Sequence, residues 1–121
     1  MSLPVAADRV AAIYRDAMRL AEAARGYFDR DGVAARAQLS PEARTALAAE
    51  SLRVTARLLA VVSWVLTQQE VAAGNRSVGI PLLATAIEAP PLALDLPPAA
   101  LQIAEGTRQL YAQMRAFDGS S

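Results

Sequence analysis

The stretch that decides the fold runs from Ala48 to Asn75 and reads AAESLRVTARLLAVVSWVLTQQEVAAGN. Its centre, Leu58 to Leu66, carries no charged residue. A helix needs about 20 apolar residues to span a bilayer, so this centre is too short to cross a membrane. A helix in water that is apolar on most sides must be covered on most sides. We therefore expect it to lie inside a bundle and to meet a second copy of the chain.

Start and stop signals extend this helix over residues 41–73. Ser40 is a favourable N-cap, Pro41 suits the first turn, and Glu42 complements the helix dipole. Gly74 supplies the stop at the other end. At 1.5 Å per residue, such a helix would be about 50 Å long.

Most apolar residues of this central helix share one half of a helical wheel. They are Leu47, Val54, Leu58, Val61, Val62, Val65 and Leu66, with Leu52 and Leu59 at the edge. Glu50, Arg53 and Arg57 lie on the opposite half. Since Arg53 and Arg57 are four residues apart, they are neighbours on one face. That face is either simply solvated or a cationic patch for an acidic protein partner, which makes Arg53 and Arg57 the candidate partner-binding residues.

Trp64, the single tryptophan, falls on the polar half of the wheel, one turn beyond Ala60. One interpretation is a core residue that the connector or another helix covers. The other is an anchor at a subunit interface, where tryptophan is enriched. Its position outside the main apolar half raises the second interpretation, so Ala60 and Trp64 are the candidate dimer contacts.

Two further helices are predicted, over residues 4–28 and 98–117, because apolar residues recur in each at spacings of three and four. Asp29 to Gly32 should stop the first helix, and Gly106 in the third indicates a close helix crossing. The connector between the second and third helices, residues 75–97, is rich in proline and in large aliphatic residues. We expect the connector to pack on the central helix, and residues 119–121 to be disordered. The expected architecture is an all-α, dimeric three-helix bundle in a single domain, residues 1–121.

Composition limits the possible functions. Apolar residues make up 54% of the chain and aromatic residues only 5%, which favours helices over a sheet. The formal net charge is +0, without the basic surplus typical of proteins that bind nucleic acid. The chain has no cysteine and no histidine, so it lacks the commonest general base and the commonest metal ligand. We expect no catalytic site, no cofactor and no metal, and a cytoplasmic location because no N-terminal signal is visible.

The string ESLRVTARLLAVVSWVLTQQEV resembles the central helix of the alphaproteobacterial family named for the regulator of CtrA degradation. The matching positions are Ser51, Arg53, Thr55, Arg57, Leu58, Ser63, Trp64, Leu66 and Gln68. Weaker similarity covers Ile13 to Asp29 and Leu96 to Met114, where Arg108, Leu110 and Tyr111 match best. The resemblance implies a dimerising helical bundle without catalytic activity. It also implies an accessory role in delivering a cell-cycle regulator to the ClpXP protease.

The sequence thus predicts a non-enzymatic protein-interaction module that forms a homodimer and binds a protein partner, and the resemblance implies that it is an adaptor for regulated proteolysis. The alternative is a small-molecule-binding regulatory domain with a pocket under the apolar connector. A ligand pocket requires a concave surface and a few converging polar groups. An adaptor requires an exposed charged or apolar patch.

Overall fold

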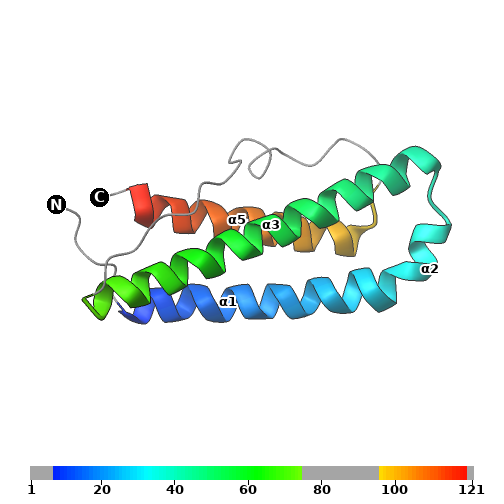
Figure 1. Ribbon diagram of the computed structural model, residues 1–121. Helices are drawn as coiled ribbons and strands as arrows, with labels where there is room; N and C mark the ends of the chain where they lie inside the picture. The colour runs from blue at the N-terminus through cyan, green and yellow to red at the C-terminus, as the bar shows by residue number, and fades with distance from the viewer. Residues whose placement is uncertain (1–6, 75–95, 120–121) are drawn as a thin grey trace.

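Helices dominate the part of the chain that the computed structural model describes, residues 7–74 and 96–119. In chain order the elements are α1 (Ala7–Gly26), the π-helix η1 (Tyr27–Asp31), α2 (Gly32–Ala37), α3 (Pro41–Ala72) and α5 (Pro98–Gly119). Three of them are long, and α3 is the longest, with 32 residues. The predicted all-α bundle with a long central helix is confirmed (Figure 1).

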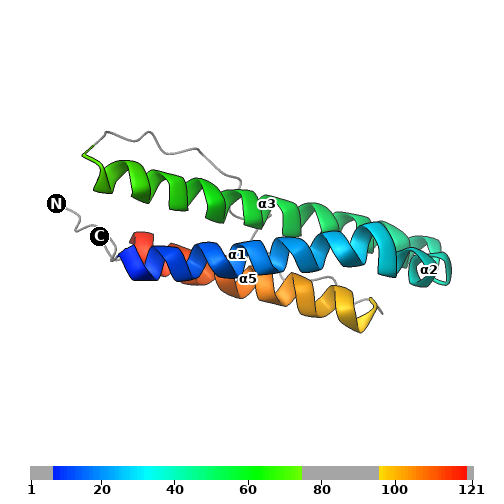
Figure 2. The same cartoon turned by 90° about the horizontal axis from the view of Figure 1, so that it is seen from below.

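Helices α3 and α5 run parallel to each other, and both run antiparallel to α1. Both begin at the end of the bundle where α2 lies, as Figures 1 and 2 show. The core agrees with this direction: Leu47 shares a cluster with Ala100, whereas Val65, further along α3, shares one with Tyr111. The end of α3 and the start of α5 therefore lie at opposite ends of the bundle.

Both ends of α3 use the signals present in the sequence. The Ser40 side chain accepts a hydrogen bond from the backbone N–H of Ala43 at 3.2 Å, which satisfies one of the free donors at the helix start. At the other end Gly74 has a φ of 86°, a left-handed conformation that glycine adopts without steric cost. Local chemistry thus fixes the length of the central helix.

The predicted stop of the first helix at Asp29 to Gly32 is wrong. The chain stays helical through a π turn to Asp31 and then through α2 to Ala37. The buried ring of Tyr27 explains why glycine is needed after that turn. A Cβ atom on Gly32 would lie 2.8 Å from the Tyr27 Cζ atom, so only glycine fits without movement. Here the glycine makes room for a side chain and does not end the helix.

Some predictions concern residues outside the described part of the chain. They are the start of the first helix in residues 1–6, the packing of the connector over residues 75–95, and the disorder of residues 120–121. At the edges of these gaps, Leu96 is buried. Gly119 is the last residue of α5, and the predicted disorder of residues 119–121 stays a prediction.

Candidate functional site

Arg57 lies inside the bundle, and its predicted position on an accessible cationic face is wrong. The side chain is 0% exposed, and its Nη1 donates to the Glu50 carboxylate at 3.1 Å. The same nitrogen donates across the helix interface to the carbonyl oxygen of Ala104 and to the hydroxyl of Thr107, each at 3.2 Å. Arg57 therefore joins α3 to α5 and has no surface to offer a partner.

The network around Arg57 compensates for the burial of two charges. Burial lowers the pKa of Arg57, and the adjacent Glu50 carboxylate opposes this shift. The Thr107 hydroxyl accepts from Arg57 and itself donates to the Ala104 carbonyl at 2.9 Å. Because Glu50 and Thr107 are each 1% exposed, the network is closed to solvent and acts as a structural clamp.

Arg53 lies at the edge of this network. Its Nη1 donates to the second carboxylate oxygen of Glu50 at 3.1 Å, and 24% of the side chain is exposed. Its role in partner binding stays a prediction. Of the two arginines predicted for that role, only Arg53 reaches the surface.

The spacing of residues along α3 is the signal in the sequence that could have identified Glu50 and Arg57 as buried. The inner face of α3 follows alternating steps of four and three residues, which is the seam of a helix packed against other helices. The residues of this inner seam are Ala43, Leu47, Glu50, Val54, Arg57, Val61 and Trp64, all buried. The wheel assigned charged residues to the solvent side, whereas the spacing places Glu50 and Arg57 with the core.

Trp64 and Ala60, the predicted dimer contacts, are buried within a single chain, with exposed fractions of 7% and 2%. The Trp64 ring stacks on Phe117 of α5, with centroids 6.5 Å apart and planes inclined by 22°. The Arg9 guanidinium lies over the Phe117 ring, 5.6 Å from its centroid. The interpretation of Trp64 as a core residue covered by another helix agrees with this structure. The part of Ala60 and Trp64 in a dimer stays a prediction.

The outer face of α3 carries the exposed leucines. Leu52, Leu59 and Leu66 are spaced seven residues apart and are 72%, 62% and 55% exposed. On the neighbouring helix α1, Tyr14 and Met18 are each 40% exposed. Large apolar side chains grouped on one surface of a small protein mark an interaction site. We call the row Leu52, Leu59 and Leu66 the outer leucine row.

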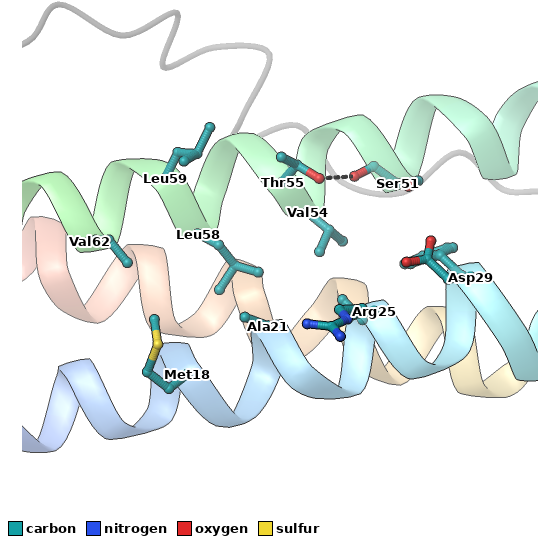
Figure 3. A pocket seen from close by; sticks show the side chains of 12 residues that line it. Met18, Ala21, Arg25, Asp29, Ser51, Val54, Thr55, Leu58, Leu59 and Val62 are labelled. Atoms are coloured by element: carbon teal, nitrogen blue, oxygen red, sulfur yellow. Dashed lines mark hydrogen bonds between the residues drawn. The ribbon is translucent and has the colours of Figure 1, made fainter.

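A groove between α1 and α3 adjoins this row (Figure 3). It has a volume of about 420 Å³ and is mostly apolar, with Met18 on the α1 side. Leu58 and Val62 point toward α1, whereas Leu59 points away from it, as Figure 3 shows. Among the polar residues at the groove, the Thr55 hydroxyl is occupied by a hydrogen bond to the Ser51 carbonyl at 3.1 Å.

No group of three or more potential metal-ligating side chains comes together in residues 7–74 and 96–119. Within those residues, no helix is long and apolar enough to cross a membrane.

Comparison with known proteins gives one family and one similar structure. The model of the family described as "Protein of unknown function (DUF1465)" matches residues 3–121. The fold is similar to the crystal structure of RcdA from Caulobacter crescentus CB15, with 29% sequence identity and a TM-score of 0.69. That alignment covers 98% of this chain and 90% of the other. No curated protein matches significantly. The resemblance to the family named for the regulator of CtrA degradation is thus confirmed.

Proposed function

The chain belongs to the DUF1465 family, and we propose that it is a non-enzymatic interaction module that acts as a dimeric adaptor in regulated proteolysis. The observation that carries this proposal is the outer leucine row on α3. The inner seam of the same helix is already filled by α1 and α5, so the exposed leucines do not serve the core of the described chain. A surface of this kind fits a protein partner.

The non-enzymatic part of the proposal rests on where the charged side chains lie. Glu50 and Arg57 are closed to solvent and bound to each other. A general base must reach the proton that it removes, within about 3 Å or through one water, and Glu50 has no such access. The chain also contains no histidine and no cysteine, the residues most used for this chemistry.

The role in proteolysis comes from the similarity to RcdA, whose name denotes a regulator of CtrA degradation. The same role at 29% identity would make this chain a cytoplasmic accessory factor that helps deliver a cell-cycle regulator to ClpXP. Arg53 and the outer leucine row are the described residues that we propose for contact with other proteins.

Reconstituted proteolysis tests this function. Purified ClpXP and the CtrA homologue of the same organism are incubated with and without the protein, and the half-life of CtrA is followed on gels. We expect the protein to shorten the half-life. An Arg53→Gln variant should weaken the effect, because it removes the charge while leaving a polar side chain beside Glu50. An unchanged half-life, together with no capture of ClpX or CtrA by the immobilised protein, would overturn the proposal.

A second candidate function is a small-molecule-binding regulatory domain, and the groove between α1 and α3 favours it. Its volume of about 420 Å³ falls within the range of ligand pockets, and Arg25 and Asp29 bring charges to its lining. The pocket predicted under the connector lies outside the described residues. Thermal-shift screening against a metabolite library tests this candidate. A ligand whose stabilisation is lost in Leu58→Trp, which fills the groove, would support it.

A further inference from the structure

Three arginines gather where α3 packs against α5. The Glu50 carboxylate accepts hydrogen bonds from both Arg53 and Arg57, at 3.1 Å each. On α5, Arg108 directly follows Thr107, whose hydroxyl accepts from Arg57. Burial is the main cause that lowers the pKa of Arg57, and the positive charges of Arg108 and Arg53 lower it further. Both guanidinium groups therefore lie close enough to repel Arg57, and one buried carboxylate is shared by two of the three cations.

Arg53 and Arg108 border the seam between α3 and α5 on the side away from α1. We call these two residues the arginine pair. Their side chains are 24% and 31% exposed. Because α1 packs on both α3 and α5, the side of the seam toward α1 is closed, and a partly exposed residue at the seam reaches solvent on the other side. The neighbours of Arg53 one turn away on α3 are Ala49 and Ala56, which are too small to cover it.

The arginine pair keeps unused hydrogen-bond donors. Within residues 7–74 and 96–119, Arg53 hydrogen-bonds only to Glu50, and Arg108 only to Glu105, each through Nη1. A guanidinium carries five N–H donors in a rigid fork that matches the two oxygens of a carboxylate. Most donors of each fork thus remain for a further acceptor. Glu105 is itself 47% exposed, so its pair with Arg108 is of the weak, solvated kind that an incoming group displaces at little cost.

We propose that the arginine pair binds an acidic segment of the protein partner, with one carboxylate on each guanidinium. The inference deepens the proposed adaptor function and rests on it, because it states the chemistry of the partner and adds Arg108 to the contact. Charge complementarity carries it: an incoming carboxylate offsets the repulsion among the three arginines, whereas a neutral or basic segment does not.

The spacing of the arginine pair specifies the segment further. Arg53 precedes Arg57 by four residues, about 6 Å along α3, and Arg108 lies about 1.5 Å beyond Thr107 along the parallel helix α5. Since Arg57 bonds to Thr107, the pair spans about 8 Å along the bundle. In an extended chain, side chains two residues apart point to the same side and lie about 7 Å apart. An extended segment with acidic residues at every second position matches this span.

Removal of single charges tests the arginine pair. Arg53→Gln and Arg108→Gln each keep a polar side chain, and the dissociation constant is measured for ClpX and for the CtrA homologue of the same organism. For the protein that binds, we expect each substitution to raise the dissociation constant about 3- to 10-fold. The difference from the wild type should shrink as salt rises from about 0.05 to 0.5 M, because salt screens partly exposed charges. An unchanged dissociation constant for Arg108→Gln overturns the inference.

Arg19→Gln is the matched control. Arg19 lies on α1, is 71% exposed and pairs with Asp16 of its own helix at 3.9 Å, three residues away, as Arg108 pairs with Glu105. Its replacement should leave the dissociation constant unchanged. An equal loss of binding in Arg19→Gln and Arg108→Gln would reflect the total charge of the protein and would overturn the inference.

Two competing occupants give other results. If residues 75–95 of the same chain held the arginine pair, Arg108→Gln would lower the melting temperature and leave partner binding intact. If the ligand were nucleic acid, a labelled DNA duplex would bind the wild type and lose affinity in both arginine variants. Either outcome overturns the inference. We expect Arg108→Gln to melt with the wild type and the duplex not to bind.

Carbodiimide cross-linking identifies the acidic segment, because this reagent joins an amine directly to a carboxylate. The chain contains no lysine, so the wild type offers only its N-terminal amine. Arg53→Lys and Arg108→Lys keep the charge and add one side-chain amine at the site. Each should link to Asp or Glu residues within one short segment of the bound ClpX or CtrA, as mass spectrometry would show. Arg19→Lys adds the same amine on α1 and should not link.

The cross-links also state when the inference is wrong. It is overturned if Arg108→Lys binds the partner without linking to it, or if its links scatter over the partner as widely as those of Arg19→Lys.

The two proposals fail in different ways. If the arginine pair links to an acidic segment of ClpX or CtrA but the half-life of CtrA does not respond to the protein, the adaptor function fails and the binding site stands. If the protein shortens the half-life of CtrA and Arg108→Gln acts like the wild type, the binding site fails and the function stands. Capture of neither ClpX nor CtrA overturns both.

Discussion

Arg57 and Glu50 lie two turns apart on α3 and meet in a 3.1 Å ion pair from which solvent is excluded. Both residues belong to α3, but the network also joins two helices, because the Nη1 atom of Arg57 donates to the Ala104 carbonyl and the Thr107 hydroxyl of α5. Any axial slip of α5 against α3 would break these bonds. The pair thus fixes which turn of α5 faces which turn of α3.

Removing one partner of this pair should destabilise the fold strongly. Arg57→Met keeps much of the side-chain volume but leaves the Glu50 carboxylate buried without its main donor. We expect a loss of about 3–5 kcal/mol in the free energy of unfolding, measured by urea denaturation. Replacing both residues, Glu50→Leu with Arg57→Met, should recover most of that loss because no unpaired charge remains.

Arg108→Met is the matched control for this prediction. Arg108 also pairs with a glutamate of its own helix, Glu105, at 2.7 Å, but its side chain is 31% exposed and its partner 47%. Exposed pairs contribute about 0–1 kcal/mol, so this variant should unfold close to the wild type. Equal losses for Arg57→Met and Arg108→Met would contradict the role assigned to the buried pair.

Trp64→Ala should destabilise the single chain by about 3–5 kcal/mol, because the ring is buried among α1, α3 and α5. The loss should not depend on protein concentration, since the ring stacks on Phe117 of its own chain. Thermal melts at several concentrations measure both quantities. If the destabilisation by Trp64→Ala disappears at low protein concentration, Trp64 contributes to a subunit interface and this prediction is wrong.

Two glycine substitutions should differ by about 1–3 kcal/mol although each adds one methyl group to a helix. The new Cβ of Gly32→Ala would meet the Tyr27 ring and the Tyr27 carbonyl oxygen, at 2.8 and 2.9 Å. That of Gly106→Ala would meet the Cδ2 atom of Leu20 at 2.9 Å, the movable end of a flexible side chain. Both variants gain about 1 kcal/mol of helix propensity. Gly32→Ala should be clearly destabilised and Gly106→Ala close to the wild type, as urea titration would show.

Tyr27→Phe should change the pH dependence of stability. The Tyr27 hydroxyl is buried and has no hydrogen-bond partner in the described part of the chain, and this burial raises its pKa while Arg36 opposes the shift. A tyrosine whose folded pKa is raised stabilises the fold below the unfolded pKa of about 10, and that stability is lost as the pH rises through the folded value. The wild type should therefore lose more stability above pH 10 than Tyr27→Phe.

Below that pH, Tyr27→Phe should be neutral or should stabilise the fold by about 1–3 kcal/mol at most, because a buried hydroxyl without a partner is removed. Urea titrations at pH 7 and above pH 10 measure both effects. A large loss at pH 7 would mean that the hydroxyl has a partner after all, and the prediction would fail.

Local signals in the sequence were sufficient for the main helices. Ser40 and Pro41 mark the start of α3, and Gly74 marks its end, because capping depends on a few neighbouring residues. Gly106 likewise predicts a close helix crossing, and Leu20 of α1 lies against it. The helix ends and the close crossing at Gly106 could thus be predicted from the sequence alone.

The burial or exposure of individual side chains on α3 could not be predicted from such local signals. A helical wheel divides α3 into an apolar half and a polar half. On that basis Arg57 is predicted to face solvent, and Leu59 is predicted to lie at the edge of the core. In the structure Arg57 is buried because acceptors on α5 satisfy it, and those acceptors lie 47 and 50 residues away in sequence. Leu59 is exposed because the two neighbouring helices already cover the other side of α3. Both outcomes depend on partners that a single-helix pattern does not contain.

The π turn at Tyr27–Asp31 changes the direction in which the side chains of the following helix, α2, point. An α-helix rotates by about 100° with each residue, and a π turn accommodates one residue more than an α turn. Without it, the side chains of α2 would continue in the angular phase of α1. With it, they are rotated by about 100° without any break in the helical backbone. One residue therefore re-aims an entire segment, which a flexible loop of several residues would do less rigidly.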